Sequence, residues 1–170
     1  MDYSFIIRRA LHNQEDALAI KQVMDDAFTK YMEDTGLHGT MEALEEHTND
    51  ILSDIDSKYV YLAFVDGIPV GSIRVSIDET SGTAYISRFG VCRGYQNIGI
   101  GKSFMNLIDK LLISKGIHTA MLHTASKYKE LVRFYYGCGF YIKSTSEDRG
   151  YIRALFLKEY EAVRRTNRFG

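Results

Sequence analysis

The chain has 170 residues, of which 45% are hydrophobic and 25% charged, and its formal net charge is −1. These values are typical of a globular protein and predict one domain, residues 1–170, with a substantial core. A charge so close to zero excludes the basic surface by which proteins bind nucleic acid, and two cysteines are too few for a disulfide framework.

Strand and helix patterns alternate along the chain. In chain order we expect a strand at 5–11, helices at 16–33 and 40–52, strands at 59–65, 70–77 and 84–91, a helix at 102–115, a strand at 119–124, a helix at 127–136, and strands at 141–144 and 151–157. Asp66-Gly67 lies between two β-rich runs and is typical of a tight hairpin turn. The order β-α-α-β-β-β-α-β-α-β-β predicts an α+β layered fold with helices on both faces of a mixed sheet.

The N-terminal residues lack the pattern of an exported protein. Residue 2 is Asp, and the first apolar run has only three residues, Phe5 to Ile7. A signal peptide needs a longer apolar stretch, and no later run approaches the ~20 apolar residues that span a bilayer. We therefore expect a cytoplasmic protein with no membrane partner and no nucleic-acid partner.

The segment from Val91 to Ser103 joins an expected strand to an expected helix and reads V-C-R-G-Y-Q-N-I-G-I-G-K-S. Glycine lets the backbone approach a ligand closely, and the first turn of a helix presents unpaired N–H groups at the positive end of its dipole. Such a junction binds anions, phosphate and pyrophosphate above all. We therefore predict a phosphorylated ligand at this loop.

The glycine spacing excludes two common phosphate motifs. A P-loop, GxxxxGK[ST], would need glycine where the chain has Gln96, and the dinucleotide pattern GxGxxG would need it where the chain has Phe104. Gly101-Lys102-Ser103 is then the only support for a nucleotide phosphotransferase, and no clear strand ends in an aspartate for magnesium.

The pattern that remains is Gln96-x-x-Gly99-x-Gly101. Further along, the chain reads F-Y-Y-G-C-G-F from Phe134 to Phe140, and then A-L-F-L-K from Ala154 to Lys158. In this order and separation the three elements resemble the GNAT superfamily of acyl-CoA-dependent N-acyltransferases. The resemblance covers residues 58–160 and implies a GNAT-like fold with a mixed, mostly antiparallel central sheet flanked by helices.

In that family the glycine loop binds the pyrophosphate of coenzyme A and the preceding strand binds its pantetheine arm. The resemblance thus implies acetyl-CoA as co-substrate, without a metal, on a core at residues 58–160, with acceptor-side helices at 12–57. The implied cofactor-binding residues are Phe89, Gly90, Val91, Gln96, Asn97, Ile98, Gly99, Ile100, Gly101, Lys102, Ser103 and Tyr128. A backbone N–H near Val91 is the candidate donor to the thioester oxygen.

Tyr135 occupies the tyrosine position of the family's helix-end motif and is the candidate general acid for the departing thiolate. Packing is the competing interpretation, because Tyr128, Leu131, Val132 and Tyr135 have the spacing of one buried helix face. Tyr128 also departs from the family, whose members often have a cofactor-binding asparagine there.

The chain also departs from the family in lacking the usual general base. Members often carry a glutamate on the strand before the loop, where this chain has Tyr85-Ile86-Ser87-Arg88. A water chain held by Ser87, or a base from Glu33, Asp34 or His123, remains open, although His123 lies in an expected buried strand where histidine is commonly structural. An α-amino group needs less help than a lysine-like amine, so the missing carboxylate favours an acceptor of low pKa.

These observations predict an N-acetyltransferase that moves an acetyl group from acetyl-CoA to a small-molecule or peptide primary amine in a ternary complex. The alternative is a non-catalytic acyl-CoA-binding or regulatory module. Acidic side chains would suit a cationic acceptor, and Arg74 or Arg149 a carboxylate-bearing one. The candidate acceptor residues are Tyr31, Glu33, Asp34, His38, Arg74, Arg149 and Tyr151. Tyr59 and Tyr61, expected to be exposed, are candidates for a homodimer interface.

Overall fold

The computed structural model describes residues 3–37 and 41–161, so His38 lies outside the described residues. The elements are β1 Phe5–Arg9, α1 Gln14–Thr35, α2 Glu42–Glu45, α3 Thr48–Ser57, β2 Tyr59–Val65, β3 Ile68–Asp78, β4 Thr83–Val91, α4 Ile100–Ser114, β5 Thr119–Ala125, α5 Lys129–Gly137, β6 Tyr141–Ser146 and β7 Arg153–Glu159. Within these ranges no helix combines the length and the apolar character that a membrane crossing requires.

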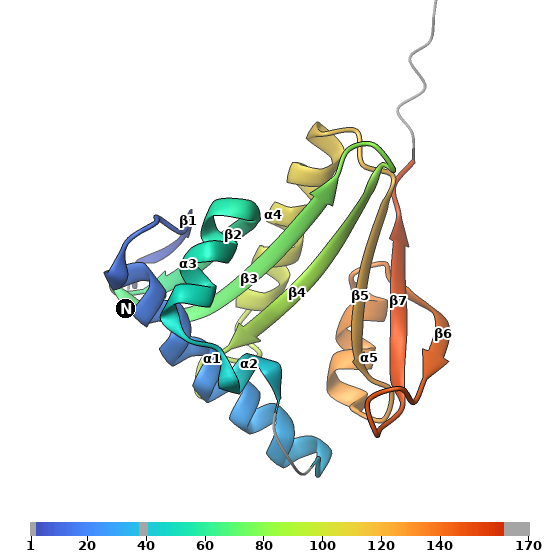
Figure 1. Cartoon of the computed structure of the whole chain (residues 1–170), viewed down its shortest axis with the longest axis horizontal. Coiled ribbons are helices and arrows are strands. Elements are labelled where there is room, and N and C mark those ends of the chain that lie inside the picture. The colour runs from blue at the N-terminus through green and yellow to red at the C-terminus, as the bar shows by residue number, and fades with distance from the viewer. Residues whose placement is uncertain (1–2, 38–40, 162–170) are drawn as a thin grey trace, which may run out of the picture.

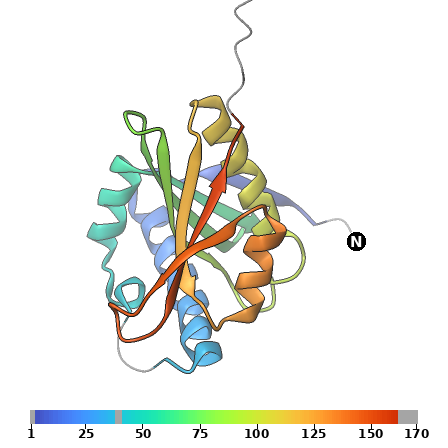
Figure 2. The ribbon, with the colours of Figure 1, turned by 90° about the vertical axis from the view of Figure 1, so that its right-hand side faces the viewer.

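The strands form one seven-stranded sheet in the order β1-β2-β3-β4-β5-β7-β6. Every neighbouring pair is antiparallel except β4 and β5, which run parallel. Helices α1, α2 and α3 cover one face of the sheet, and α4 and α5 cover the other (Figures 1 and 2). The predicted α+β fold with a mixed, mostly antiparallel sheet is thereby confirmed.

The β4–β5 pair opens along its length. The two strands pair only where residues 83–85 meet residues 119–121, and beyond Tyr85 they diverge (Figure 1). In the same part of β4, Arg88 and Phe89 stand opposite the single residue Ile73 of β3. This is a β-bulge, and it places Arg88 at φ 49°, a left-handed conformation that few residues other than glycine adopt. Phe89, Gly90 and Val91 consequently have no strand partner on the β5 side.

Two hydrophobic cores hold the layers together. On one face, Phe104 and Ile108 of α4 are fully buried in a cluster that includes Ile73 of β3. On the other face, Met24 of α1 is buried in a cluster with Leu62 of β2. Each such side chain contributes about 1.5–3 kcal/mol when it leaves water. The sheet is therefore supported from both sides.

The prediction of one helix over residues 40–52 was wrong. The chain forms two helices, α2 and α3, and between them Glu46 is extended, with φ −68° and ψ 135°. The element order thus contains one helix more than predicted, while the remaining boundaries differ by a few residues. Tyr59 and Tyr61 are also less exposed than expected: both are partly buried, and the guanidinium of Arg9 lies 4.3 Å from the centre of the Tyr59 ring.

Candidate active site

A cavity of about 410 Å³ lies between α1, the end of β4, the glycine loop and α5. We call it the loop cavity. Its walls are Ala27, Phe28, Lys30, Tyr31, Phe89, Gly90, Val91, Tyr95, Gln96, Asn97, Gly99, Gly101, Lys102, Tyr128, Glu130, Leu131 and Phe134. Nine of the twelve predicted cofactor-binding residues are in this set. Ile98, Ile100 and Ser103 are not: Ile98 is 54% exposed, and Ile100 is buried in the core.

The loop presents its backbone to this cavity. Helix α4 begins at Ile100 after Gly99, whose φ of 94° only glycine adopts readily, and no side chain caps this end. The N–H groups of the first turn are therefore available to a ligand. Gln96 donates a hydrogen bond of 3.1 Å from Nε2 to the carbonyl oxygen of Val91, which ties the loop to the end of β4.

Tyr128 joins the cavity wall to α1. Its hydroxyl donates a hydrogen bond of 2.6 Å to Asp34 and accepts one of 3.3 Å from Lys30, and Lys30 and Asp34 also form an ion pair. Burial and the Asp34 carboxylate raise the pKa of Tyr128 to about 12. The hydroxyl is thus already bound to α1, which limits its use as a polar contact to a cofactor.

A second cavity, of about 330 Å³, lies where β4 and β5 diverge. We call it the splay cavity. Its walls are Phe28, Tyr31, Met41, Glu42, Asp54, Lys58, Ser76, Tyr85, Ile86, Ser87, Arg88, Phe89, Leu122, His123, Thr124, Leu131, Tyr135, Arg149, Tyr151 and Arg153. Phe28, Tyr31, Phe89 and Leu131 belong to both cavities. The two cavities therefore adjoin, with Phe89 of β4 between them.

Tyr135 lies on α5 at the wall of the splay cavity. Its side chain is 5% exposed, and its ring is surrounded by aromatic rings, with Phe134 and Phe156 each at 5.4 Å between centroids. Burial raises the pKa of Tyr135 well above its usual range, so the hydroxyl stays protonated. Tyr135 is thus a core side chain at the cavity wall, and its role as general acid stays a prediction.

Tyr85 and His123 face each other across the splay cavity. The Tyr85 hydroxyl lies 2.6 Å from Nδ1 of His123. Burial raises the pKa of Tyr85, while burial and the nearby charges of Arg153 and Arg149 lower the pKa of His123. Near neutral pH both groups are therefore uncharged, so the phenol can donate to the imidazole nitrogen. His123 is only partly buried and is not enclosed in the core.

The other candidate bases are already engaged. Glu33 pairs with Arg93 at 2.6 Å, and Asp34 is held by Lys30 and Tyr128. Neither carboxylate lines the splay cavity. Ser87 does line it, on the same strand as Tyr85. The Tyr85–His123 pair was missed as a unit because its members are brought together only by the parallel pairing of β4 and β5.

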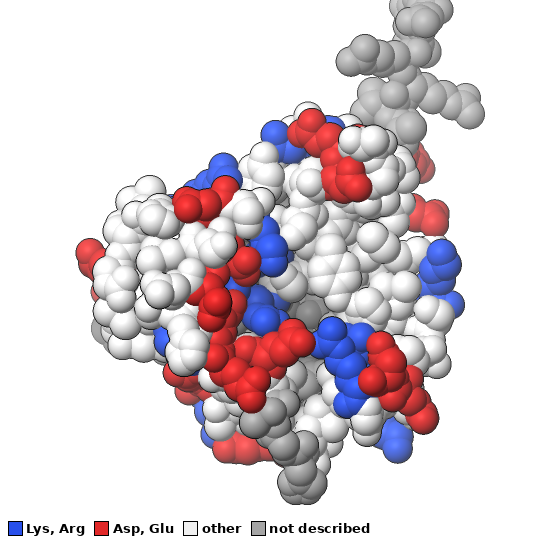
Figure 3. Space-filling model, in the orientation of Figure 1, with Lys and Arg blue, Asp and Glu red and all other residues white. Residues whose placement is uncertain are grey.

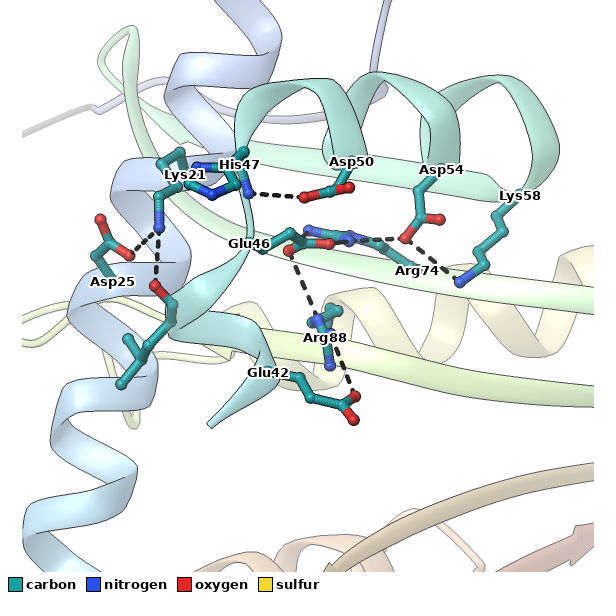
Figure 4. A network of polar contacts seen from close by, with 11 residues as sticks. Lys21, Asp25, Glu42, Glu46, His47, Asp50, Asp54, Lys58, Arg74 and Arg88 are labelled. Carbon is teal, nitrogen blue, oxygen red and sulfur yellow. Dashed lines mark hydrogen bonds and ion pairs between the residues drawn. The ribbon is translucent and has the colours of Figure 1, made fainter. Parts of the chain in front are cut away.

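Arg74, a candidate acceptor residue, does not reach the cavity. It is fully buried on β3, and its guanidinium binds Glu46 and Asp54 (Figure 4). These carboxylates belong to an acidic group on the face that carries α2 and α3, where Lys58 and Arg88 lie beside them (Figure 3). Among the described residues no three side chains of His, Cys, Asp or Glu are grouped as a metal site would need.

A mixed sheet with one splayed parallel pair, followed by a glycine-capped helix, defines the acyltransferase fold of the GNAT type. The model of the acetyltransferase (GNAT) family matches residues 21–140, and the chain belongs to this family. No curated protein matches the sequence.

Solved structures share the fold over nearly the whole chain. The PaiA N-acetyltransferase of Thermoplasma acidophilum, in complex with coenzyme A, is 22% identical with a TM-score of 0.79, covering 92% of this chain and 99% of its own. Naa50 of Arabidopsis thaliana, in complex with the bisubstrate analogue CoA-Ac-MVNAL, is 19% identical with a TM-score of 0.70. The match covers 94% of this chain and 100% of the Naa50 chain. The ribosomal-protein-S18-alanine N-acetyltransferase of Escherichia coli is 13% identical with a TM-score of 0.72. That match covers 92% of this chain and 94% of the E. coli chain.

Proposed function

We propose that the protein is an N-acetyltransferase that moves an acetyl group from acetyl-CoA directly to a primary amine within a ternary complex. The observation that carries this proposal is the junction of the two cavities at Phe89. One cavity ends at the anion-binding backbone of α4, and the other contains an acid and a proton acceptor. Membership of the family, and the coenzyme A complexes of two proteins with the same fold, support the choice of co-substrate.

The loop cavity suits the cofactor by its shape and chemistry. Gly99 has open space where a Cβ would lie, so a phosphate could approach the N–H groups at the start of α4. The unpaired edge of β4 at residues 89–91 can form hydrogen bonds to the amides of the pantetheine arm. An N–H near Val91 would stabilise the oxyanion of the tetrahedral intermediate.

The splay cavity supplies the proton transfers. As the amine nitrogen attacks the thioester carbon, Tyr85 accepts the amine proton while its own proton passes to Nδ1 of His123. Collapse of the intermediate breaks the carbon–sulfur bond, and Tyr135 gives its proton to the departing thiolate. The net result moves one proton from the amine to the thiol, and the protonated His123 later restores Tyr135 through solvent.

Steady-state kinetics tests the proposal. Thiol release from acetyl-CoA should require an amine and should give intersecting double-reciprocal lines, as a ternary complex demands; parallel lines would indicate an acetyl-enzyme intermediate instead. Tight binding of acetyl-CoA without thiol release from a broad amine panel would favour the alternative, a non-catalytic acyl-CoA-binding module. That alternative was suggested by the missing strand glutamate, for which the Tyr85–His123 pair offers a replacement.

A further inference from the structure

Three arginines line the splay cavity around the Tyr85–His123 pair. Arg88 comes from the bulge of β4, Arg149 from the turn before β7, and Arg153 from β7 itself. Their charges act on the pair: all three lower the pKa of Tyr85 against the larger effect of burial, and Arg149 and Arg153 lower that of His123. The cavity therefore presents positive charge beside its proton acceptor.

These arginines form only long ion pairs with carboxylates of the described residues: Arg88 with Glu46 and Glu42, Arg149 with Glu42, and Arg153 with Asp148. The nearest carboxylate oxygens are 3.6 Å from Arg88, 3.8 Å from Arg149 and 3.6 Å from Arg153, beyond hydrogen-bond distance. Moreover, Nε of Arg88 and Nε of Arg153 are buried without a hydrogen-bond partner in the described part of the chain. Each of the three guanidinium groups therefore keeps hydrogen-bonding capacity for a ligand that enters the cavity.

The acidic side chains of α2 and α3 hold these arginines only loosely, because Glu42 lies 3.9 Å from Arg88 and 3.8 Å from Arg149. Glu46 and Asp54 are bound to Arg74, and Asp54 also pairs with Lys58 at 3.3 Å. Arg74, whose Nε is likewise without a partner, has both of its Nη atoms bound, by three bonds of 2.5–2.9 Å. The acidic group thus neutralises the protein's own cations, and the two members that line the splay cavity, Glu42 and Asp54, are themselves paired with Arg88, Arg149, Arg74 and Lys58.

We propose that the acceptor of this transferase is an amine that carries a carboxylate, and that Arg149 and Arg153 bind this carboxylate with Arg88 beside them. The planar guanidinium matches a carboxylate with two parallel hydrogen bonds. Because the arginines adjoin the Tyr85–His123 pair, the amine and the carboxylate must be close together in the acceptor, as in an α-amino acid. The inference rests on the proposed function and names its substrate class.

The experiment compares matched acceptors with the full chain and acetyl-CoA. Thiol release is measured for the twenty common L-amino acids, for the amide of each active one, for the corresponding decarboxylated amine, and for phosphoethanolamine. The free acid should exceed its amide and its amine in kcat/KM by about 10- to 100-fold, the loss expected for hydrogen bonds to a charged group. Equal or better rates for the amide or amine would overturn the inference and leave the transferase intact. A preference for the phosphate would overturn the carboxylate assignment.

Variants locate the effect. Arg149→Gln removes a half-exposed side chain and should raise KM for the amino acid about tenfold or more, while KM for acetyl-CoA stays unchanged. Arg153→Gln should do the same and shrink the preference for acid over amide. Lys143→Gln removes the same charge from the exposed strand β6 and serves as the control. Equal kinetics for all three variants would contradict the inference about the acceptor. If no acceptor supports thiol release, the proposed function itself is refuted.

Discussion

Arg74 and Glu46 form a buried two-pronged ion pair, with Nη1 2.5 Å from Oε1 and Nη2 2.9 Å from Oε2 (Figure 4). Arg74 is on β3 and fully buried, and Glu46 is in the break between α2 and α3. Asp54 of α3 adds a third bond of 2.7 Å to the same guanidinium. Through this pair, the helices beside the splay cavity are fixed to the sheet.

Glu46→Gln should destabilise the protein by about 3–5 kcal/mol, because it removes the carboxylate that compensates a buried guanidinium. The free energy of unfolding in urea measures the loss. Glu45→Gln changes an exposed neighbour and should stay within about 0.5 kcal/mol of the parent. If the two variants unfold alike, the pair does not anchor these helices.

The glycine loop can be tested with two alanine variants of one helix. Gly99 at the start of α4 and Gly116 after its end both have positive φ, 94° and 69°, and both have open space where a Cβ would lie. Alanine at either position should therefore lower the free energy of unfolding by about 1–2 kcal/mol, to a similar extent in the two variants. Gly99→Ala alone should weaken acetyl-CoA binding, by about tenfold or more, because its methyl group keeps the phosphate from the N–H groups. Calorimetric titration with equal affinities for the two variants would count against the loop as the cofactor site.

The sequence predicts those parts of the fold that local chemistry decides. Asp66 and Gly67 form the predicted hairpin turn with φ of 49° and 77°, values that Asp and Gly tolerate. Gly99 starts the helix after β4, close to where the apolar spacing begins. In both cases a residue's own conformational preference and its immediate neighbours agree with the final structure.

Long-range partners account for what the sequence could not predict. The break at Glu46 interrupts a helical pattern because Glu46 binds Arg74, which is 28 positions away. In the same way, Tyr85 and His123 are 38 positions apart, and Arg153 reaches them from another strand. Such groups carry no spacing signal, because the order of the strands in the sheet brings them together.

The Tyr85–His123 pair predicts a specific dependence of activity on pH. The imidazole accepts a proton only when neutral, and its pKa is lowered from the usual value of about 6.5 by burial and by Arg153 and Arg149, with Asp148 opposing them. Protonation therefore occurs at a lower pH than for an ordinary histidine. The acid limb of kcat/KM should have its midpoint below about 6.5, and the rate should be level above it until other groups titrate.

Variants of His123 and Tyr85 test whether this pair causes the pH dependence. His123→Gln should lower kcat by about 10²-fold or more and remove the acid limb, whereas His118→Gln, at an exposed histidine, should leave both unchanged. Tyr85→Phe should lower kcat to a similar extent, since it interrupts the relay at its first atom. A Tyr85→Phe variant with normal kcat would show that the amine loses its proton by another route.

Tyr135→Phe separates the packing of the buried tyrosine from its proposed role as an acid. Phenylalanine retains the ring that packs against Phe134 and Phe156, so the thermal midpoint should change little. Loss of the hydroxyl should lower kcat by about 10²-fold or more at unchanged KM for acetyl-CoA, because the thiolate must then leave without a proton donor. Tyr136→Phe, at the neighbouring tyrosine that is 51% exposed, provides the matched control and should be silent. A leaving group of lower thiol pKa needs less help, so a more acidic thioester donor should recover part of the Tyr135→Phe rate; packing alone would predict no such recovery.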